Sequence, residues 1–157
     1  MKSRLTIVVL IASLAINGLL LWAALDRPAP ALAQDHTNEL APYMGNMQRY
    51  VHKLGLAVDA KNQALADFYI FEIEEVVTEL QQFDNYEGFQ IAALSKAMLA
   101  QFVTALDKKV EAADWAGSEA AFAQVVTACN SCHLATQRPY IKIVASKSNP
   151  FNQDFSK

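Results

Sequence analysis

The stretch with the most chemical content is Cys129-Asn130-Ser131-Cys132-His133. Two cysteines separated by two residues and followed directly by a histidine form the covalent attachment pattern for c-type haem. Each thiol can form a thioether with one vinyl group of the haem, and the histidine can bind the iron as its proximal ligand. The 157-residue sequence contains only these 2 cysteines. The motif therefore predicts one covalent haem c on Cys129 and Cys132, with His133 as an iron ligand.

Three other chemistries use a Cys-x-x-Cys pair. A thioredoxin-like redox centre needs a βαβ context and usually lies near the N-terminal end of its domain, whereas this pair lies late in a helical pattern. A zinc site needs two further ligands, and the remaining histidines, His36 and His52, are distant in sequence and unpaired. A disulfide between the two cysteines would be strained on a helix. The haem interpretation is favoured over all three.

The first residues have the features of an export signal. Lys2 and Arg4 precede the uncharged apolar run Leu5–Leu25, and Ala31-Leu32-Ala33 supplies a small-residue cleavage site. The apolar run is also long enough to span a bilayer, so an uncleaved anchor at residues 5–25 is the competing interpretation. In either case the positive N-terminal charges place the following domain outside the cytoplasm. We expect a signal peptide at residues 1–33 and a periplasmic protein, with a tether to the inner membrane as the alternative.

The charge of the sequence limits the classes of partner. The formal net charge is −3, and removal of a leader that carries Lys2, Arg4 and Arg27 makes the remainder more acidic. No basic stripe is present that could neutralise phosphates, so nucleic acid is not an expected partner. The expected partners are redox proteins in the periplasm or membrane, and a second copy of the chain is a further candidate.

Apolar residues recur with a period near 3.6 along four segments, which indicates helices. The expected helices cover about residues 39–60, 63–83, 90–112 and 114–137. Asn62 is the expected N-cap of the second helix and Asp114 or Ser118 that of the fourth, while Gly88 is the expected pivot of the turn at 84–89. Four such helices with short connections favour an all-α, antiparallel up-down-up-down four-helix bundle.

The fourth expected helix carries the haem motif on an apolar stripe. The stripe consists of Trp115, Phe122, Val126, Cys129 and His133. Residues at steps of three, four and seven share one face of a helix, so the motif is expected to face the inside of the bundle. We expect the helix to end before Pro139, the haem domain to span residues 34–145, and residues 146–157 to form a flexible C-terminal tail.

This arrangement resembles the cytochrome c′ family, whose members are secreted four-helix bundles with Cys-x-x-Cys-His on the last helix. The matching residues are Cys129, Cys132, His133 and the first-helix segment Tyr43-Met44-Gly45-Asn46-Met47. The resemblance implies that the first helix supplies the distal side of the haem, with methionine as the sixth ligand in some members and five-coordinate iron in others. The family often has an arginine four residues after the haem histidine, where this chain has Gln137 followed by Arg138, so the resemblance is that of a divergent member.

Met44 is the first candidate for the distal iron ligand and Met47 the second, because thioether sulfur is a known axial partner of histidine. Both lie on the inward stripe of the first helix, where methionine is more often core filling than a ligand, and an iron with no protein ligand on that side is the main alternative to Met44. His52 lies off the stripe and is expected at the surface or rim. Arg138, and after it Lys142, could pair with a haem propionate, or either could be an exposed tail charge.

These residues favour a monohaem one-electron carrier, because a single haem in a small helical shell suits electron transfer and no other substrate pocket is visible in the sequence. The alternative is a five-coordinate haem protein that binds or senses NO or CO, which needs open iron or a displaceable ligand in an apolar pocket. A peroxidase would need a distal base and a polar partner beside open iron. No such pair is visible, so an enzyme is not expected.

Overall fold

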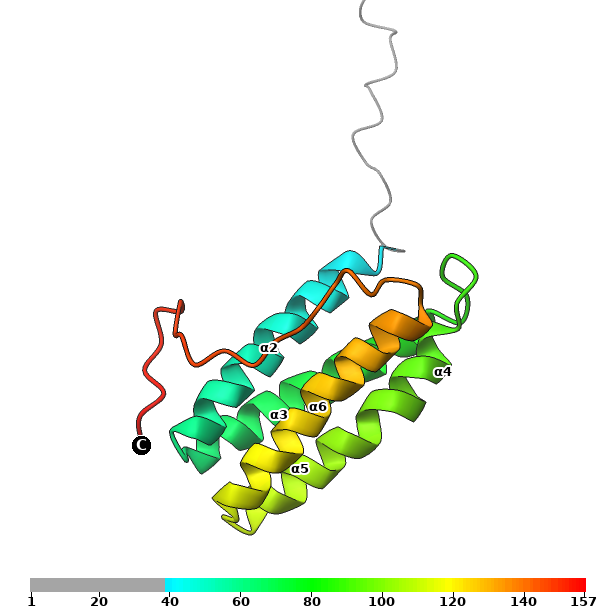
Figure 1. Cartoon of the computed structure of the whole chain (residues 1–157). Helices are drawn as coiled ribbons and strands as arrows, with labels where there is room; N and C mark the ends of the chain where they lie inside the picture. The colour runs from blue at the N-terminus through cyan, green and yellow to red at the C-terminus, as the bar shows by residue number, and fades with distance from the viewer. Residues whose placement is uncertain (1–38) are drawn as a thin grey trace, which may run out of the picture. The chain divides into compact units, whose positions relative to one another are not determined.

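The helices of this chain account for nearly all of its regular structure (Figure 1). The computed structural model describes residues 39–157. Its α-helices are α2 (Ala41–Asp59), α3 (Gln63–Glu79), α4 (Ile91–Ser95), α5 (Gln101–Glu111) and α6 (Trp115–Ala135). Within the described residues, only an isolated bridge between Tyr86 and Phe89 has β character. The expected all-α class is confirmed.

The leader predicted at residues 1–33 lies outside the described residues, as do the alternative anchor at 5–25 and His36. From residue 39 onward, none of the helices combines the length and the apolar character needed to cross a bilayer.

The first two helices begin where local sequence chemistry predicts. Pro42 lies in the first turn of α2, where a backbone N–H would have no helical partner in any case. Asn62 caps α3, because its side-chain Oδ1 accepts a hydrogen bond from the Leu65 N–H at 3.2 Å. A short 3₁₀ turn, η2 (Leu80–Gln82), extends α3 to the expected turn. In that turn Gly88 has a φ of +86°, which the absence of a Cβ permits.

The third expected helix is present but contains a π-helical stretch. The segment η3 (Lys96–Ala100) joins α4 to α5, and all three follow one another without a loop. A π turn holds more residues than an α turn, so it changes which residues face the core on either side of it. Ser95 and Leu99 are both buried there and both line the cavity described below.

Helix α6 is capped by Asp114, whose Oδ1 accepts a hydrogen bond from the Gly117 N–H at 3.0 Å. The residues of α6 that are fully buried differ from the expected stripe. They are Ser118, Val125 and Ala128, whereas Trp115, Phe122, Val126, Cys129 and His133 are only partly buried. The small side chains let α6 pack closely onto α5, and the larger ones lie on the neighbouring side of the helix.

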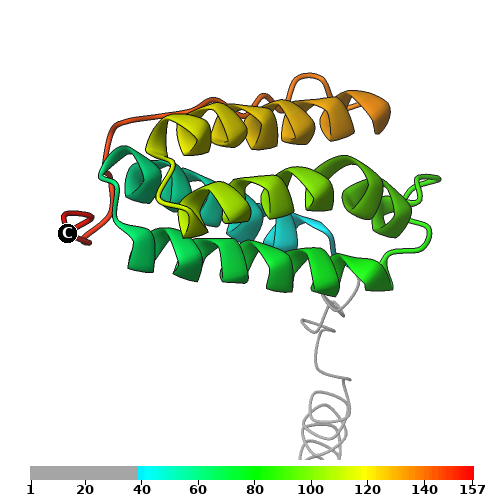
Figure 2. The ribbon, with the colours of Figure 1, turned by 90° about the horizontal axis from the view of Figure 1, so that it is seen from below.

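The helices pack in neighbouring pairs. Helix α2 contacts α3 and α6, and α5 contacts α3 and α6. Figure 2 shows α3 and α6 on opposite sides, with α2 and α5 between them. The core lies among these helices and includes Leu54, Ile73, Leu80, Leu106 and Val125, all of which are almost fully buried.

The chain after α6 packs on the helices, including residues 146–157, for which the sequence predicts a flexible tail. Residues 139–157, which we call the C-terminal strap, have no helix or strand but run back along α2 and α6 towards the turn between α2 and α3 (Figure 1). Phe155 is only 7% exposed. The hydroxyl of Tyr69 donates to Gln153 Oε1 at 2.6 Å, and Asn62 Nδ2 donates to the Ser156 carbonyl at 2.7 Å. Because Phe155 supplies an apolar anchor in a polar segment, the strap belongs to the same compact unit as the helices.

Candidate cofactor site

A cavity of about 460 Å³ lies among α2, the residues before and within α4 and η3, and the C-terminal part of α6. Small-molecule and cofactor pockets typically measure roughly 300–1,000 Å³, so its size suits a cofactor. Most of its lining is apolar, including Val51, Leu80, Ile91 and Ala128. The candidate site residues that line this one cavity are Met44, Met47, Cys129, Cys132, His133 and Arg138.

Cys129 and Cys132 lie one turn apart on α6, so both can reach the same cavity. They are free thiols rather than a disulfide. Burial raises the pKa of Cys129 to about 11, to which the neighbouring Cys132 contributes, and burial also raises the pKa of Cys132. A thioredoxin-like centre needs a thiolate with a lowered pKa. The surroundings of this pair shift the pKa in the opposite direction.

The imidazole of His133 is oriented by the strap. Its Nδ1 donates a hydrogen bond to the Ile141 carbonyl at 2.7 Å. In a neutral imidazole the lone pair then belongs to Nε2, the nitrogen that can bind a metal. A histidine that donates its second ring N–H to a backbone carbonyl is the usual arrangement of a metal-ligating imidazole.

Asn130, a variable position of the motif, connects α6 to the strap. Its Nδ2 donates to the Ile143 carbonyl at 2.9 Å, and its Oδ1 accepts from the Ile143 N–H at 2.8 Å. The same Nδ2 also donates to the Val126 carbonyl within α6 at 3.1 Å. Sequence reasoning missed Asn130, Ile141 and Ile143, because the contacts join residues that no helical period brings together.

Helix α2, which is far from the motif in the sequence, supplies one wall of the cavity. Met47 is 5% exposed and belongs to the core, whereas Met44 is partly buried and packs against that core. Between them in the sequence, Gly45 lines the cavity. A Cβ built on it would have no atom within 4 Å apart from its chain neighbours and the nearby backbone of its own helix. The wall therefore has open space at Gly45, which lies between the two methionines in the sequence.

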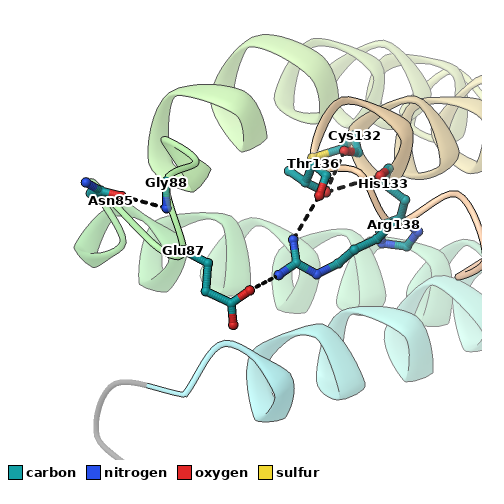
Figure 3. Close-up of polar contacts among 7 residues, drawn as sticks. All are labelled: Asn85, Glu87, Gly88, Cys132, His133, Thr136 and Arg138. Carbon is teal, nitrogen blue, oxygen red and sulfur yellow. Dashed lines mark hydrogen bonds and ion pairs between the residues drawn. The ribbon is translucent and has the colours of Figure 1, made fainter.

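Arg138 lies at the edge of the cavity, where it bridges the end of α6 and the loop before α4 (Figure 3). Its Nη1 donates to the Thr136 carbonyl at 3.0 Å, and its Nη2 forms an ion pair with Glu87. The guanidinium carbon also lies 5.8 Å from the centre of the Phe89 ring. These contacts hold a cationic group at the rim, so Arg138 is not a free tail charge.

Two other candidates lie away from this cavity. His52 and Lys142 border a second, smaller space of about 200 Å³. The Nε2 of His52 donates to the Ser148 carbonyl at 2.9 Å, and its ring packs edge-on against Phe151. His52 is therefore a structural contact of the strap, in agreement with its expected place off the apolar stripe.

In the part of the chain that the structure describes, no group of three or more His, Cys, Asp or Glu side chains could hold a bare metal ion. A structural zinc site needs four such ligands, so the described residues offer no such site around Cys129 and Cys132. No family model, curated protein or solved structure matches the chain.

Proposed function

We propose that this chain is an exported monohaem c-type cytochrome of the cytochrome c′ type that carries single electrons between redox proteins. The observation that carries the proposal is the convergence of two thiols, one oriented imidazole and two thioethers in one apolar cavity. That combination of donors suits a flat apolar macrocycle with axial iron ligands and suits no other cofactor considered above. The chain is proposed as a carrier rather than an enzyme.

The residues of the cavity have distinct roles in this proposal. Cys129 and Cys132 hold the haem through thioether bonds, and His133 binds the iron through Nε2. Haem, when bound, supplies a centre that accepts and releases one electron. Arg138 pairs with a propionate, because a guanidinium already held at the rim matches a carboxylate. The apolar walls from α2 and α6 exclude water from the remaining surface.

The proposed architecture is an antiparallel up-down-up-down four-helix bundle around that haem. Support comes from the pairwise packing of α2 with α3 and α6, and of α5 with α3 and α6. The connections are short, and short connections favour antiparallel neighbours.

Met44 is the proposed distal ligand, with Met47 as the second choice. Met44 is supported by its place on the cavity wall and by its smaller share in the core. A ligand must be able to turn its sulfur towards the iron, which a core-filling side chain cannot do without loss of packing.

A second function, the binding or sensing of NO or CO at five-coordinate iron, is favoured by the open space beside Gly45 and by the apolar wall around it. An optical spectrum separates the two. A low-spin spectrum that does not change with carbon monoxide supports the carrier with a methionine ligand. A high-spin spectrum that shifts with carbon monoxide supports the gas-binding protein and refutes the assignment of Met44.

The proposed location is the periplasm, reached through the leader at residues 1–33, and the proposed partners are redox proteins. A docking role is supported by apolar side chains that are exposed near the end of α6, namely Leu134, Tyr140 and Val144. Contact surfaces between redox proteins are small and transient, and exposed apolar residues near the electron-transfer centre suit them.

The double substitution Cys129→Ala/Cys132→Ala tests the proposal directly. The full chain is produced in a bacterial host that exports it and attaches haem, and intact-protein mass spectrometry measures the added mass. The unsubstituted chain is expected to carry one haem and the double variant none. Ser131→Ala, which alters the same motif without a thiol, should keep its haem. Stoichiometric covalent haem in the double variant, or none in the unsubstituted chain, would refute the proposal.

A further inference from the structure

The side chain of Asn130 uses its hydrogen-bonding capacity to join two pieces of backbone. One bond, to the Val126 carbonyl, lies within α6, and two bonds go to the N–H and the carbonyl of Ile143 in the strap. A two-point contact of this kind resembles the pairing of one residue in a β ladder. It fixes both the position and the orientation of the strap backbone at Ile143.

Ile143 lies two residues after Ile141, the residue whose carbonyl accepts the proton of His133 Nδ1. Two residues of extended chain span at most about 7 Å, so a fixed Ile143 leaves Ile141 little freedom to move. The other side of Ile141 is also held, because its N–H donates to the Arg138 carbonyl at 3.0 Å and the Arg138 N–H donates to the His133 carbonyl at 2.7 Å. The Ile141 carbonyl is thus held between the turn that ends α6 and the Asn130 contact.

From this geometry we propose that Asn130 is a positioning residue for His133, because it holds the strap so that the Ile141 carbonyl stays on Nδ1. The inference rests on the proposed haem function and deepens it, since it identifies what orients the proximal ligand and tunes its strength. Asn130 forms no hydrogen bond with the imidazole and does not line the cavity, so it acts only through the backbone of the strap.

The hydrogen bond on Nδ1 has a direct effect on Nε2. Donation of the Nδ1 proton to a carbonyl raises the basicity of the other ring nitrogen. A more basic Nε2 stabilises oxidised iron more than reduced iron, because the oxidised centre carries more positive charge. A short, persistent hydrogen bond from Nδ1 to the Ile141 carbonyl therefore lowers the reduction potential, and a longer or less populated hydrogen bond raises it.

The test compares Asn130→Ala and Asn130→Leu with Ser131→Ala in the full, haem-loaded chain. Alanine is a better helix former than asparagine, so the first variant does not weaken α6, and leucine keeps most of the side-chain volume without the hydrogen bonds. Ser131 is the matched control, because its Oγ donates to the Thr127 carbonyl within α6 at 2.9 Å and not to the strap.

Three quantities are measured on each protein: covalent haem content, reduction potential by spectroelectrochemistry, and the rate of trypsin cleavage after Lys142, an exposed strap residue. Both Asn130 variants are expected to keep their haem and to shift to a more positive potential than the unsubstituted protein. Cleavage after Lys142 should become about tenfold faster or more, because two hydrogen bonds no longer oppose opening of the strap. Ser131→Ala should match the unsubstituted protein in all three.

The outcomes separate this inference from the proposed function. Haem-loaded Asn130 variants whose potential is unchanged, or becomes more negative, overturn the positioning role, even if cleavage is faster. An equal positive shift in Ser131→Ala overturns it as well, since the shift would then not come from the strap. An unsubstituted chain that carries no haem refutes the proposed function itself, whatever the cleavage rates are.

Discussion

Met44 and Met47 lie one turn apart on α2 and line the same cavity, yet they differ in how firmly the protein holds them. Met47 is among the buried core residues, whereas Met44 is partly buried and packs on the outside of that core. A methionine can serve as an iron ligand or as core filling. Substitution of a ligand should change mainly the haem spectrum, whereas substitution of a core residue should change mainly the free energy of unfolding.

Met44→Ala should change the spectrum of the haem-loaded protein from low spin to high spin and allow carbon monoxide to bind. Its loss of stability should be modest, because less of the side chain is buried. Met47→Ala should keep the low-spin spectrum but lower the free energy of unfolding by about 2–5 kcal/mol, as expected for a buried methionine. Optical spectra and denaturant unfolding of both variants check this. A spectral change in Met47→Ala alone would exchange the roles of the two residues.

At the scale of secondary-structure elements, the close approach of α2 and α6 depends on Gly55. A Cβ added at this residue would lie 2.6 Å from Cζ of Phe122, well inside contact distance. The ring of Phe122 therefore occupies the space that a side chain on α2 would need. This contact joins the same pair of helices that carries the methionines and the haem motif.

Gly55→Ala should lower the free energy of unfolding by about 1 kcal/mol. The steric clash costs about 1–3 kcal/mol, and the better helix propensity of alanine returns about 1 kcal/mol. The same substitution made in a Phe122→Ala background should stabilise the chain instead, because the ring it would meet is absent. Denaturant unfolding of the unsubstituted chain, the two single variants and the double variant gives the coupling free energy between Gly55 and Phe122. The same loss in both backgrounds would contradict the contact.

The strap is the second element whose packing makes a measurable prediction. Phe155 is buried, and its ring lies 6.3 Å from that of Tyr69 on α3, while Phe151 is partly exposed. Phe155→Ala should therefore lower the free energy of unfolding by about 3 kcal/mol, and Phe151→Ala by clearly less. Thermal and denaturant unfolding of both variants test this. Equal effects, or none for Phe155→Ala, would show that the strap is loose, as the sequence alone suggests.

Helix positions were accessible from the sequence because they depend on local chemistry. Asn62, Gly88 and Asp114 lie at helix ends or turns as predicted, since caps and positive φ angles involve residues three or fewer apart. The π stretch at Lys96–Ala100 was not predictable, because one wide turn shifts the apolar period by a single residue. The prediction of the buried face of α6 was also wrong in part. Ser118 is fully buried, although a serine carries no apolar signal in the sequence.

The candidate residues could be named from the sequence, but the backbone contacts that support them could not. The cavity brings together Cys129, Cys132 and His133 of the motif with Met44 and Met47 of the first helix, because helical faces place them there, whereas His52 lies elsewhere. The bond from His133 to Ile141 and the contact of Asn130 with Ile143 depend on the path of a segment without regular structure. No periodicity encodes such a path, so it could only be read from three-dimensional packing.

For the molecule as a whole, the proposed function predicts that stability depends strongly on a haem bound in the cavity between α2 and α6. Its apolar walls would face water without the macrocycle, and burial of apolar area is worth roughly 25 cal/mol per Å². The free energy gained by burying these apolar walls is a large share of the marginal stability of a domain.

The haem-free Cys129→Ala/Cys132→Ala chain should therefore have a lower melting temperature than the haem-loaded protein. It should keep a helical far-ultraviolet circular dichroism spectrum and lose much of its near-ultraviolet signal, as in a molten globule. Circular dichroism in both ranges, with thermal melting, makes the comparison. A haem-free chain that melts cooperatively at the same temperature would mean that the helices need no cofactor to complete their core.

The strap gives the molecule contacts of very high sequence separation. Lys53 donates to Gln153, and Asn62 donates to Ser156, across 100 and 94 residues respectively. Contacts within and between successive helices form quickly. Contacts between residues far apart in the sequence form more slowly, because a long loop must be closed at a cost in conformational entropy. The helices should therefore assemble while the strap is still open, so the side of α6 that carries Asn130 and His133 stays accessible until the last stage of folding. Attachment enzymes would have their access in that interval, and closure of the strap would then set the proximal imidazole in its final orientation.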